Sequence, residues 1–445
     1  MGIRPGAVPG VRVHCGGDRA TVLFGRREDG GDGPPRRLVV ESPAAGTERY
    51  IVKRLLVGLA LLAWVAGAAT AQGLTVWTTF NNPTLDYLQQ DVAAFARAFD
   101  VEVDVVKLDI NELKQQMLLS APQGQAGDVI VGIPHDQMAE MAVGGVLADL
   151  TNTATDAYLS DLGQQARLAF TYNGRLFGLP LFVEGPALLY NRDLLAGVPA
   201  TYDELITVAQ ELTTSDTFGF MHDINNFYFS YGWLHSFGGY VFGRDAGALN
   251  PDDVGLANEG AVRGARALQA LRFEHGIIPA GTNYDVANGL FIDGALAMFY
   301  TGPWAVGQAR EAGIDVGVAP MPPLADGTPW SGFMGVQGVL VNQFSESRID
   351  AVNLAKWLTR SDAQLGYAKL EGRIPASQSA LAQVADDPIV SGFGEALLNS
   401  EPMPNIPEMG QVWGPMANAL GVITESADAD VEAALEQAVS EIEGE

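Results

Sequence analysis

Cysteine is almost absent from this sequence of 445 residues, in which Cys15 is the only one. Cys15 precedes the part of the chain that we expect to be the mature protein, so that part would contain no disulfide and no thiolate nucleophile. It would also contain no cysteine that could carry a lipid anchor. The mature protein is therefore expected to be free of the membrane.

Histidine is scarce, and familiar catalytic motifs are missing. The five histidines show no H-E-x-x-H pattern and no other close metal-ligand spacing, so we expect no metal site. The sequence also lacks the G-x-S-x-G nucleophile elbow, the Walker phosphate loop and the G-x-G-x-x-G fingerprint. No cofactor is therefore indicated. Carboxylates are abundant, however, so a glycosidase that uses two of them stays an alternative.

Basic residues are outnumbered by acidic ones, with 26 Lys and Arg against 53 Asp and Glu and a net charge of −27. Residues 1–71 hold 10 of those basic and 6 of those acidic residues, so the remaining chain carries a net charge of −31. Such a charge repels the phosphates of nucleic acids and anionic membrane surfaces. Neither is therefore expected as a partner.

A secretory signal is predicted inside the N-terminal region. Lys53-Arg54 precedes the apolar run Leu55–Ala66, and small residues up to Ala71 follow. Ala69-x-Ala71 predicts cleavage between Ala71 and Gln72, and the run is short for a membrane-spanning helix. We therefore expect the mature protein in the periplasm.

The 51 residues before this signal form a doubtful extension. They are rich in Gly, Pro and Arg and show no apolar periodicity. A secretory signal should lie at the N-terminus, so we expect residues 1–51 to be untranslated or disordered, and translation to begin at Val52.

After Gln72, strand and helix patterns alternate. The stretch Leu74–Phe80 is typical of a strand, with Asn82 as the expected N-cap of a helix and Pro83 at its first position. Further strands are predicted at 101–105 and 128–131, and a helix at 137–143 that Gly144-Gly145 would end. This alternation predicts an α/β fold with a mostly parallel sheet.

A second region of the same kind follows from about residue 185. The stretch 261–275 has helical periodicity, 295–300 predicts a strand, and Gly302-Pro303 marks a new helix start. No Ser- or Pro-rich linker separates the two regions, whose junctions we place near residues 183 and 335. The acidic pairs Asp252-Asp253 and Asp386-Asp387 are expected in turns.

Several stretches resemble the maltose-binding proteins and together span nearly all of residues 74 to about 420. The most specific are Leu188–Leu195 (LLYNRDLL), Thr301–Ala305 (TGPWA) and Met403–Pro407 (MPNIP), the last followed by Trp413. The Tyr-Asn-x-Asp pattern occurs widely in solute-binding proteins, whereas the MPNIP run is closer to the maltose-specific branch.

The resemblance implies a periplasmic-binding-protein fold with two discontinuous α/β lobes, a multi-strand hinge and a ligand cleft between the lobes. The N-terminal lobe would comprise residues 72–182 and 338–384, and the C-terminal lobe residues 185–334 and 388–445. The protein would bind maltose, a maltodextrin or a related disaccharide and deliver it to permease subunits of an ABC importer in the inner membrane. We expect a monomer that is not an enzyme.

The resemblance also implies site residues. Trp304 and Trp413 match aromatic platforms for sugar rings, and Tyr228 and Phe229 match an aromatic pair of the second lobe. Asp136 and Glu184 match carboxylates that accept hydrogen bonds from sugar hydroxyls. The remaining candidates are Asn81 and Asn82 in the first strand-to-helix turn, and Glu112, which matches a further cleft acid.

Other positions depart from the family pattern. Gly132 or Ile133 replaces a tryptophan, Gln137 an arginine and Asn226 a glutamate, and Gly414 and Ala417 replace two residues near the last tryptophan. Because these departures leave fewer stacking surfaces and charged donors, the choice between maltose, trehalose and another glucoside stays open. Two alternatives also stay open: another neutral solute on the same fold, and a secreted carbohydrate-active enzyme that uses Glu184 and Asp136.

Overall fold

The computed structural model describes residues 11–16, 19–24, 37–41, 73–153 and 155–444. The chain divides into two compact units, Met1–Thr70 and Ala71–Glu445. The predicted signal, its cleavage site and Val52 lie outside the described residues. Within the described ranges, no helix has both the length and the apolar character needed to cross a membrane.

The first unit contains a small antiparallel sheet. Its strands are β1 (Val11–Gly16), β2 (Arg19–Phe24) and β3 (Arg37–Glu41), paired in that order. That residues 1–51 are untranslated or disordered, and that translation begins at Val52, stay predictions.

The second unit contains two larger sheets, and we call the part of the chain around each sheet a lobe. The strands of the first lobe are β4 (Leu74–Thr78), β5 (Val103–Lys107), β6 (Val129–Pro134), β9 (Gly178–Glu184), β16 (Phe333–Val341) and β17 (Ile374–Pro375), and β18 (Glu401–Pro402) pairs with the start of β16. Those of the second lobe are β10 (Ala187–Asn191), β11 (Phe218–Met221), β14 (Leu296–Thr301) and β15 (Val316–Ala319). Two short hairpins, β7 (Thr171–Tyr172) with β8 (Arg175–Leu176) and β12 (Phe242–Asp245) with β13 (Ala248–Val254), complete the strands.

Both larger sheets are mixed, so the prediction of a mostly parallel sheet is wrong. In the first sheet, with the order β17–β9–β16–β6–β4–β5, β4 is parallel to β5 and β6, but β16 is antiparallel to both β6 and β9. In the second, β10 is antiparallel to β14 and β15. The reason is that β16 re-enters the first sheet from the second lobe and therefore runs against its neighbours.

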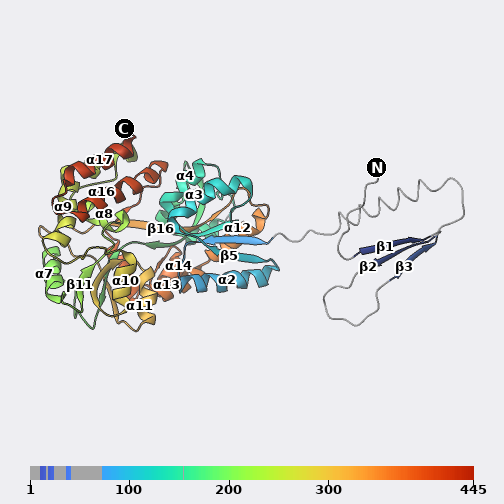
Figure 1. Ribbon diagram of the computed structural model, residues 1–445, viewed down its shortest axis with the longest axis horizontal. Helices are drawn as coiled ribbons and strands as arrows, with labels where there is room; N and C mark the ends of the chain where they lie inside the picture. Colours follow the sequence, from blue (N-terminus) through green and yellow to red (C-terminus); the bar gives the residue numbers. More distant parts are fainter. Residues whose placement is uncertain (1–10, 17–18, 25–36, 42–72, 154, 445) are drawn as a thin grey trace. The chain divides into compact units, whose positions relative to one another are not determined.

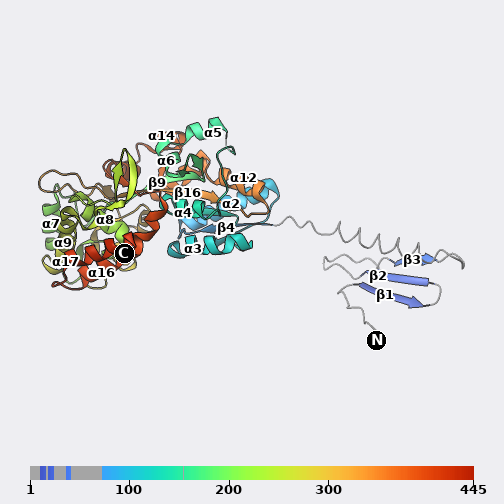
Figure 2. The same cartoon turned by 90° about the horizontal axis from the view of Figure 1, so that it is seen from above.

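Helices cover both sheets. Around the first sheet lie α2 (Thr84–Phe99), α3 (Ile110–Ser120), α4 (Met138–Val143), α5 (Asp156–Asp161), α6 (Gln164–Ala169), α12 (Arg348–Leu358), α13 (Ser361–Glu371) and α14 (Gln378–Val384). Around the second lie α7 (Tyr202–Leu212), α8 (Phe227–Ser236), α9 (Glu259–Phe273), α10 (Tyr284–Ile292), α11 (Trp304–Glu311), α15 (Pro388–Ala396), α16 (Trp413–Glu425) and α17 (Val431–Glu443). In Figures 1 and 2, α2, α3 and α12 of the first group lie to the right, and α7, α9 and α17 of the second group lie to the left.

Each lobe has its own apolar core. Val76, Ile130 and Leu340 are fully buried in the first, whereas Phe220 and Trp233 are fully buried in the second. A further cluster around Leu189, Phe299 and Phe393 packs on the second sheet. Because β6 and β14 are buried along their whole length, their continuous apolar runs are explained by cover on both faces.

Two local predictions are wrong. Helix α2 begins at Thr84 after Pro83, and Asn82 is not its N-cap; the Asn82 carbonyl instead accepts a hydrogen bond from Gln308 Nε2 at 3.2 Å. Asp252 and Asp253 lie in strand β13 and not in a turn, because this segment pairs with β12.

Other local predictions are confirmed. Gly144 follows the last residue of α4, and Gly145 has a positive φ of 69° that suits glycine. The Asp387 side chain caps α15 through the N–H groups of Ile389 and Val390.

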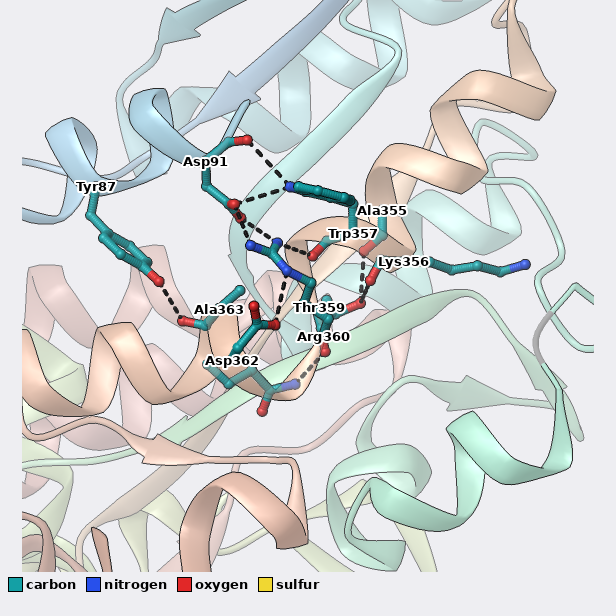
Figure 3. Close-up of polar contacts among 10 residues, drawn as sticks. Tyr87, Asp91, Ala355, Lys356, Trp357, Thr359, Arg360, Asp362 and Ala363 are labelled. Atoms are coloured by element: carbon teal, nitrogen blue, oxygen red, sulfur yellow. Dashed lines mark hydrogen bonds and ion pairs between the residues drawn. The ribbon is translucent and has the colours of Figure 1, made fainter. Parts of the chain in front are cut away.

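A polar network joins Asp91 of α2 to Trp357 of α12 and to Arg360, which lies between α12 and α13 (Figure 3). Arg360 binds both carboxylate oxygens of Asp91, with N–O distances of 2.6 and 2.8 Å, and its guanidinium lies 4.3 Å from the Trp357 ring. Trp357 Nε1 also donates to Asp91 Oδ1 at 3.0 Å. Because α2 follows the Asn81–Asn82 turn and α13 leads to Glu371, this network sets two walls of the cleft described below.

The buried ring of His135 joins three segments near the crossing between the lobes. Its Nδ1 accepts from the Val336 N–H of β16 at 3.1 Å, and its Nε2 therefore carries the proton and donates to the Met403 carbonyl at 2.9 Å. Burial lowers the pKa of His135 from 6.5 to about 4. The neutral ring is thus the form that the fold requires.

Removing the Asp91 carboxylate should destabilise the protein. Asp91→Ala leaves the Arg360 guanidinium without its main partner, so the free energy of unfolding should fall by roughly 3 kcal/mol in urea denaturation. Glu259→Ala is the control, since Glu259 pairs with Arg263 on an exposed helix face, and should cost less than about 0.5 kcal/mol. Equal losses in the two variants would show that the network does not fasten α2.

The imidazole of His135 should make stability fall in acid. The His135 ring takes up a proton below about pH 6.5 in the unfolded chain but only near pH 4 in the folded protein. The free energy of unfolding that the neutral ring contributes is therefore fully present above pH 7 and is lost as the pH falls from 6.5 to 4. Between pH 7 and pH 5, wild type should lose about 2 kcal/mol more unfolding free energy than His135→Gln. His275→Gln, at a half-buried histidine of the second lobe, should lose as much as wild type.

Candidate functional site

A cavity of about 1160 Å³ lies between the two lobes. The first lobe contributes the β4–α2 turn, the end of β6 and the end of β9, whereas the second contributes the starts of α8, α10 and α11. The cavity therefore forms where strands of the two sheets end, as expected for ligand sites of α/β proteins.

The structure brings eight of the nine candidate residues into the lining of this cavity: Asn81, Asn82, Asp136, Glu184, Tyr228, Phe229, Trp304 and Trp413. Glu112 does not line it, and its Oε2 accepts from Gln116 Nε2 on the exposed side of α3. Ile110, Asn111 and Lys114 line the cavity instead. Successive helical residues differ by about 100° in direction, so the inward face of α3 leaves Glu112 out.

Aromatic side chains form much of the second-lobe wall. The Trp304 ring lies 6.2 Å from Tyr228 and 6.1 Å from Phe229, centroid to centroid. Trp413 packs 5.9 Å from Phe227 and 5.8 Å from Phe333. Trp304 and Trp413 are only half-buried, so their rings offer apolar faces to the cavity.

The Asp136 carboxyl faces the cavity from the turn after β6. Its Oδ2 accepts a hydrogen bond from Trp413 Nε1 at 3.2 Å, whereas Oδ1 is buried without a partner among the described residues. Burial raises the pKa of Asp136 to about 6, and the bond from Trp413 opposes that shift. Asp136 therefore positions Trp413 and keeps one free acceptor oxygen.

Glu184 belongs to a buried ion network at the end of β9. Gln337 Nε2 donates to Glu184 Oε1 at 2.7 Å, and Arg373 donates to Oε2. Arg373 also donates through Nε to Glu371 Oε2 at 2.6 Å. Burial raises the pKa of Glu184, and the positive charge of Arg373 lowers it.

Five cavity-lining residues carry buried polar atoms without a hydrogen-bond partner in the described part of the chain. These atoms are Thr84 Oγ1, Asp136 Oδ1, Gln137 Oε1, Asn288 Oδ1 and Gln337 Oε1. All can accept a hydrogen bond, and leaving such an atom buried and unpaired costs about 1–3 kcal/mol. The walls of this cavity are therefore rich in polar side chains, as a ligand with many hydroxyl groups would require.

Contacts between the lobes lie close to the cavity. Gln308 of α11 donates to the Asn82 carbonyl, and Asn288 Nδ2 donates to Gln308 Oε1 at 2.8 Å. A Cβ atom at Gly307 would lie 2.8 Å from Pro83 Cγ and 3.3 Å from Glu371 Cγ. Only glycine allows this approach of α11 to the first lobe.

Sequence reasoning missed several lining residues, notably Asn288, Gln308, Gln337, Glu371 and Arg373. None lies in a stretch that resembles the family motifs, and isolated polar residues in helices or strands look like ordinary surface residues. Among the described residues, no cluster of His, Cys, Asp or Glu is arranged to hold a metal ion.

Comparisons with known proteins identify the family. Residues 90–392 match the family model of bacterial extracellular solute-binding proteins. A galactooligosaccharide-binding protein of Bacillus subtilis (strain 168) is 31% identical over 385 residues, which cover 83% of this chain and 89% of that protein.

Two solved structures are similar over the same part of the chain. The Thermus thermophilus maltotriose binding protein, bound with maltotriose, is 43% identical with a TM-score of 0.82, covering 83% of this chain and 99% of that one. The maltose-maltodextrin binding protein of Alicyclobacillus acidocaldarius is 30% identical with a TM-score of 0.77, covering 83% and 100%. The predicted two-lobed α/β fold is confirmed, and this chain belongs to the family of bacterial extracellular solute-binding proteins.

Proposed function

We propose that this protein binds a neutral malto-oligosaccharide between its lobes and delivers it to an ABC importer. The observation that carries the proposal is a single cavity lined both by aromatic rings and by carboxylate, amide and hydroxyl side chains. Sugar hydroxyls donate to such acceptors, and the C–H faces of sugar rings pack on aromatic rings. A net negative charge also disfavours an anionic ligand.

The relatives support the ligand class. Two are named for maltotriose or maltodextrin and one for galactooligosaccharides, so all three bind short sugar chains. We propose a maltodextrin rather than a galactooligosaccharide, since the more similar solved structure contains maltotriose at 43% identity.

We propose roles for the eight lining candidates. Trp304 and Trp413 stack on sugar rings, with Tyr228 and Phe229 supporting Trp304. Asp136 and Glu184 accept hydrogen bonds from hydroxyls. Asn81 and Asn82, both exposed in the β4–α2 turn, contact the ligand from the first lobe. Glu112 has no such role, because it lies outside the cavity lining.

The lobes are proposed to close on the ligand as rigid bodies. The division we favour is 72–182 with 338–384 against 185–334 with 388–445, and the separate apolar cores support it. The Gln308 bond to Asn82 and the Trp413 bond to Asp136 would then be contacts of the shut form.

Export and assembly are proposed on the sequence and the family. The protein would be cleaved between Ala71 and Gln72, act in the periplasm as a monomer and dock on the permease subunits of its importer. We also propose that it is not an enzyme, since both Glu184 oxygens are held by Gln337 and Arg373 rather than poised for proton transfer.

Isothermal titration of the purified protein tests the ligand. Maltotriose should bind saturably with a Kd near 1 μM or below, about −8 kcal/mol, and a galactooligosaccharide, trehalose and glucose more weakly. Incubation with maltotriose should release no glucose. Tighter binding of the galactooligosaccharide would show that the ligand is not a maltodextrin. Release of glucose would show that the protein hydrolyses the sugar.

Removing either aromatic platform should weaken the sugar complex. Trp304→Ala and Trp413→Ala should each raise the Kd for maltotriose at least about tenfold, because a stacked ring face is lost. Phe273→Ala removes an exposed ring outside the cavity and should leave the Kd unchanged. Full affinity in both tryptophan variants would place the ligand elsewhere.

A side chain at Gly307 should hinder closure without touching the ligand. Gly307→Val places atoms against Pro83 and Glu371, so the maltotriose Kd should rise about tenfold or more while thermal stability changes little. Gly289→Val is the control, because no atom lies within 4 Å of a Cβ there. Small-angle scattering should show the Gly307 variant staying open with sugar present; a normal Kd would refute the closure contact.

A further inference from the structure

A single arginine holds two carboxylates side by side in the wall of the cavity. Arg373 donates to Glu184 and to Glu371, and the three side chains have exposed fractions of 5%, 4% and 2%. All three residues line the cavity. We call Glu184, Arg373 and Glu371 the ion row. The row therefore presents an acceptor, a donor and a second acceptor toward the space that the ligand would fill.

The row is held rigidly by the first lobe alone. The Arg373 guanidinium lies 4.3 Å from the Phe182 ring and 5.5 Å from the Phe80 ring. Glu371 ends α13 and Glu184 ends β9, so backbone elements fix both carboxylates. The arrangement is therefore in place before the lobes meet.

Stability does not account for this network. Buried ion pairs gain little over apolar side chains of the same volume, because removing charges from water is costly. Two carboxylates with one guanidinium also leave a net negative charge in the wall. Arg373 uses two of the five N–H donors of a guanidinium on these carboxylates, and each carboxylate oxygen can accept more than one hydrogen bond.

The second lobe faces the row with polar rings. Burial raises the pKa of Tyr284, and the charge of Glu371 raises it further; Glu184 has the same effect on Tyr228. Glu371 is also the residue that Gly307 approaches from α11. The row is thus at the contact between lobes, where a bound ligand would lie.

We propose that Glu371 and Arg373 contact the sugar directly and select a ring with two adjacent free hydroxyls. Each hydroxyl of such a diol both donates and accepts, so one donates to Glu371 and its neighbour to Glu184, while Arg373 donates to their oxygens. This inference rests on the proposed sugar-binding function and names residues that no family motif indicates.

Titration of Glu371→Gln and Arg373→Lys with maltotriose and its monodeoxy analogues tests the proposal. Each variant should raise the maltotriose Kd about tenfold or more, since bonds to charged partners are the strong ones. Removing the hydroxyl that meets Glu371 should cost wild type affinity and cost Glu371→Gln much less. Asp149→Asn is the control, because it alters an arginine–carboxylate pair of the first lobe that lies outside the cavity and should keep wild-type affinity.

The outcomes separate the two proposals. Normal affinity in Glu371→Gln, or a loss matched by Asp149→Asn, would overturn the role of the row while leaving sugar binding in place. Failure of wild type to bind any sugar would overturn both. If Glu371→Gln does not fold, by circular dichroism and thermal melting, Glu371→Asp replaces it: the shortened carboxylate should show the same loss and the same insensitivity to the missing hydroxyl.

Discussion

The antiparallel pairing of β9 with β16 is the constraint on which the rest of the site depends. Gly335 pairs with Glu184 and Gln337 with Phe182, so the last residues of one crossing strand lie beside the first residues of the other. The chain leaves the first lobe after Glu184 and enters β10 at Ala187. A shift of register by one residue would put Glu184 and Gln337 on opposite faces of the sheet and break the hydrogen bond between them.

The cavity is costly for the protein in the absence of a ligand. Unpaired acceptors such as Asn288 Oδ1 and Gln337 Oε1, and the ion row around Arg373, are buried in positions where apolar residues would be at least as stable. The shut form thus has a cost of its own. Contacts of both lobes with a bound sugar would offset that cost and make closure depend on the sugar.

Local patterns predicted much of the fold because they report burial. The apolar run 295–300 and the Gly302-Pro303 start identified β14 and α11 closely. Strand direction was mispredicted, since no local feature of β16 reveals that it returns from the other lobe. Motif residues such as Trp304 and Asp136 line the cavity as expected, but Arg373 and Asn288 were not predicted, because only folding brings isolated polar residues together.

The account is tested most directly by a crystal structure of the protein with maltotriose. We expect sugar hydroxyls within hydrogen-bond distance of the Asp136 and Glu184 carboxylates, with rings stacked on Trp304 and Trp413. A sugar that contacts neither carboxylate, or that binds outside the cleft between the lobes, would contradict the central claim.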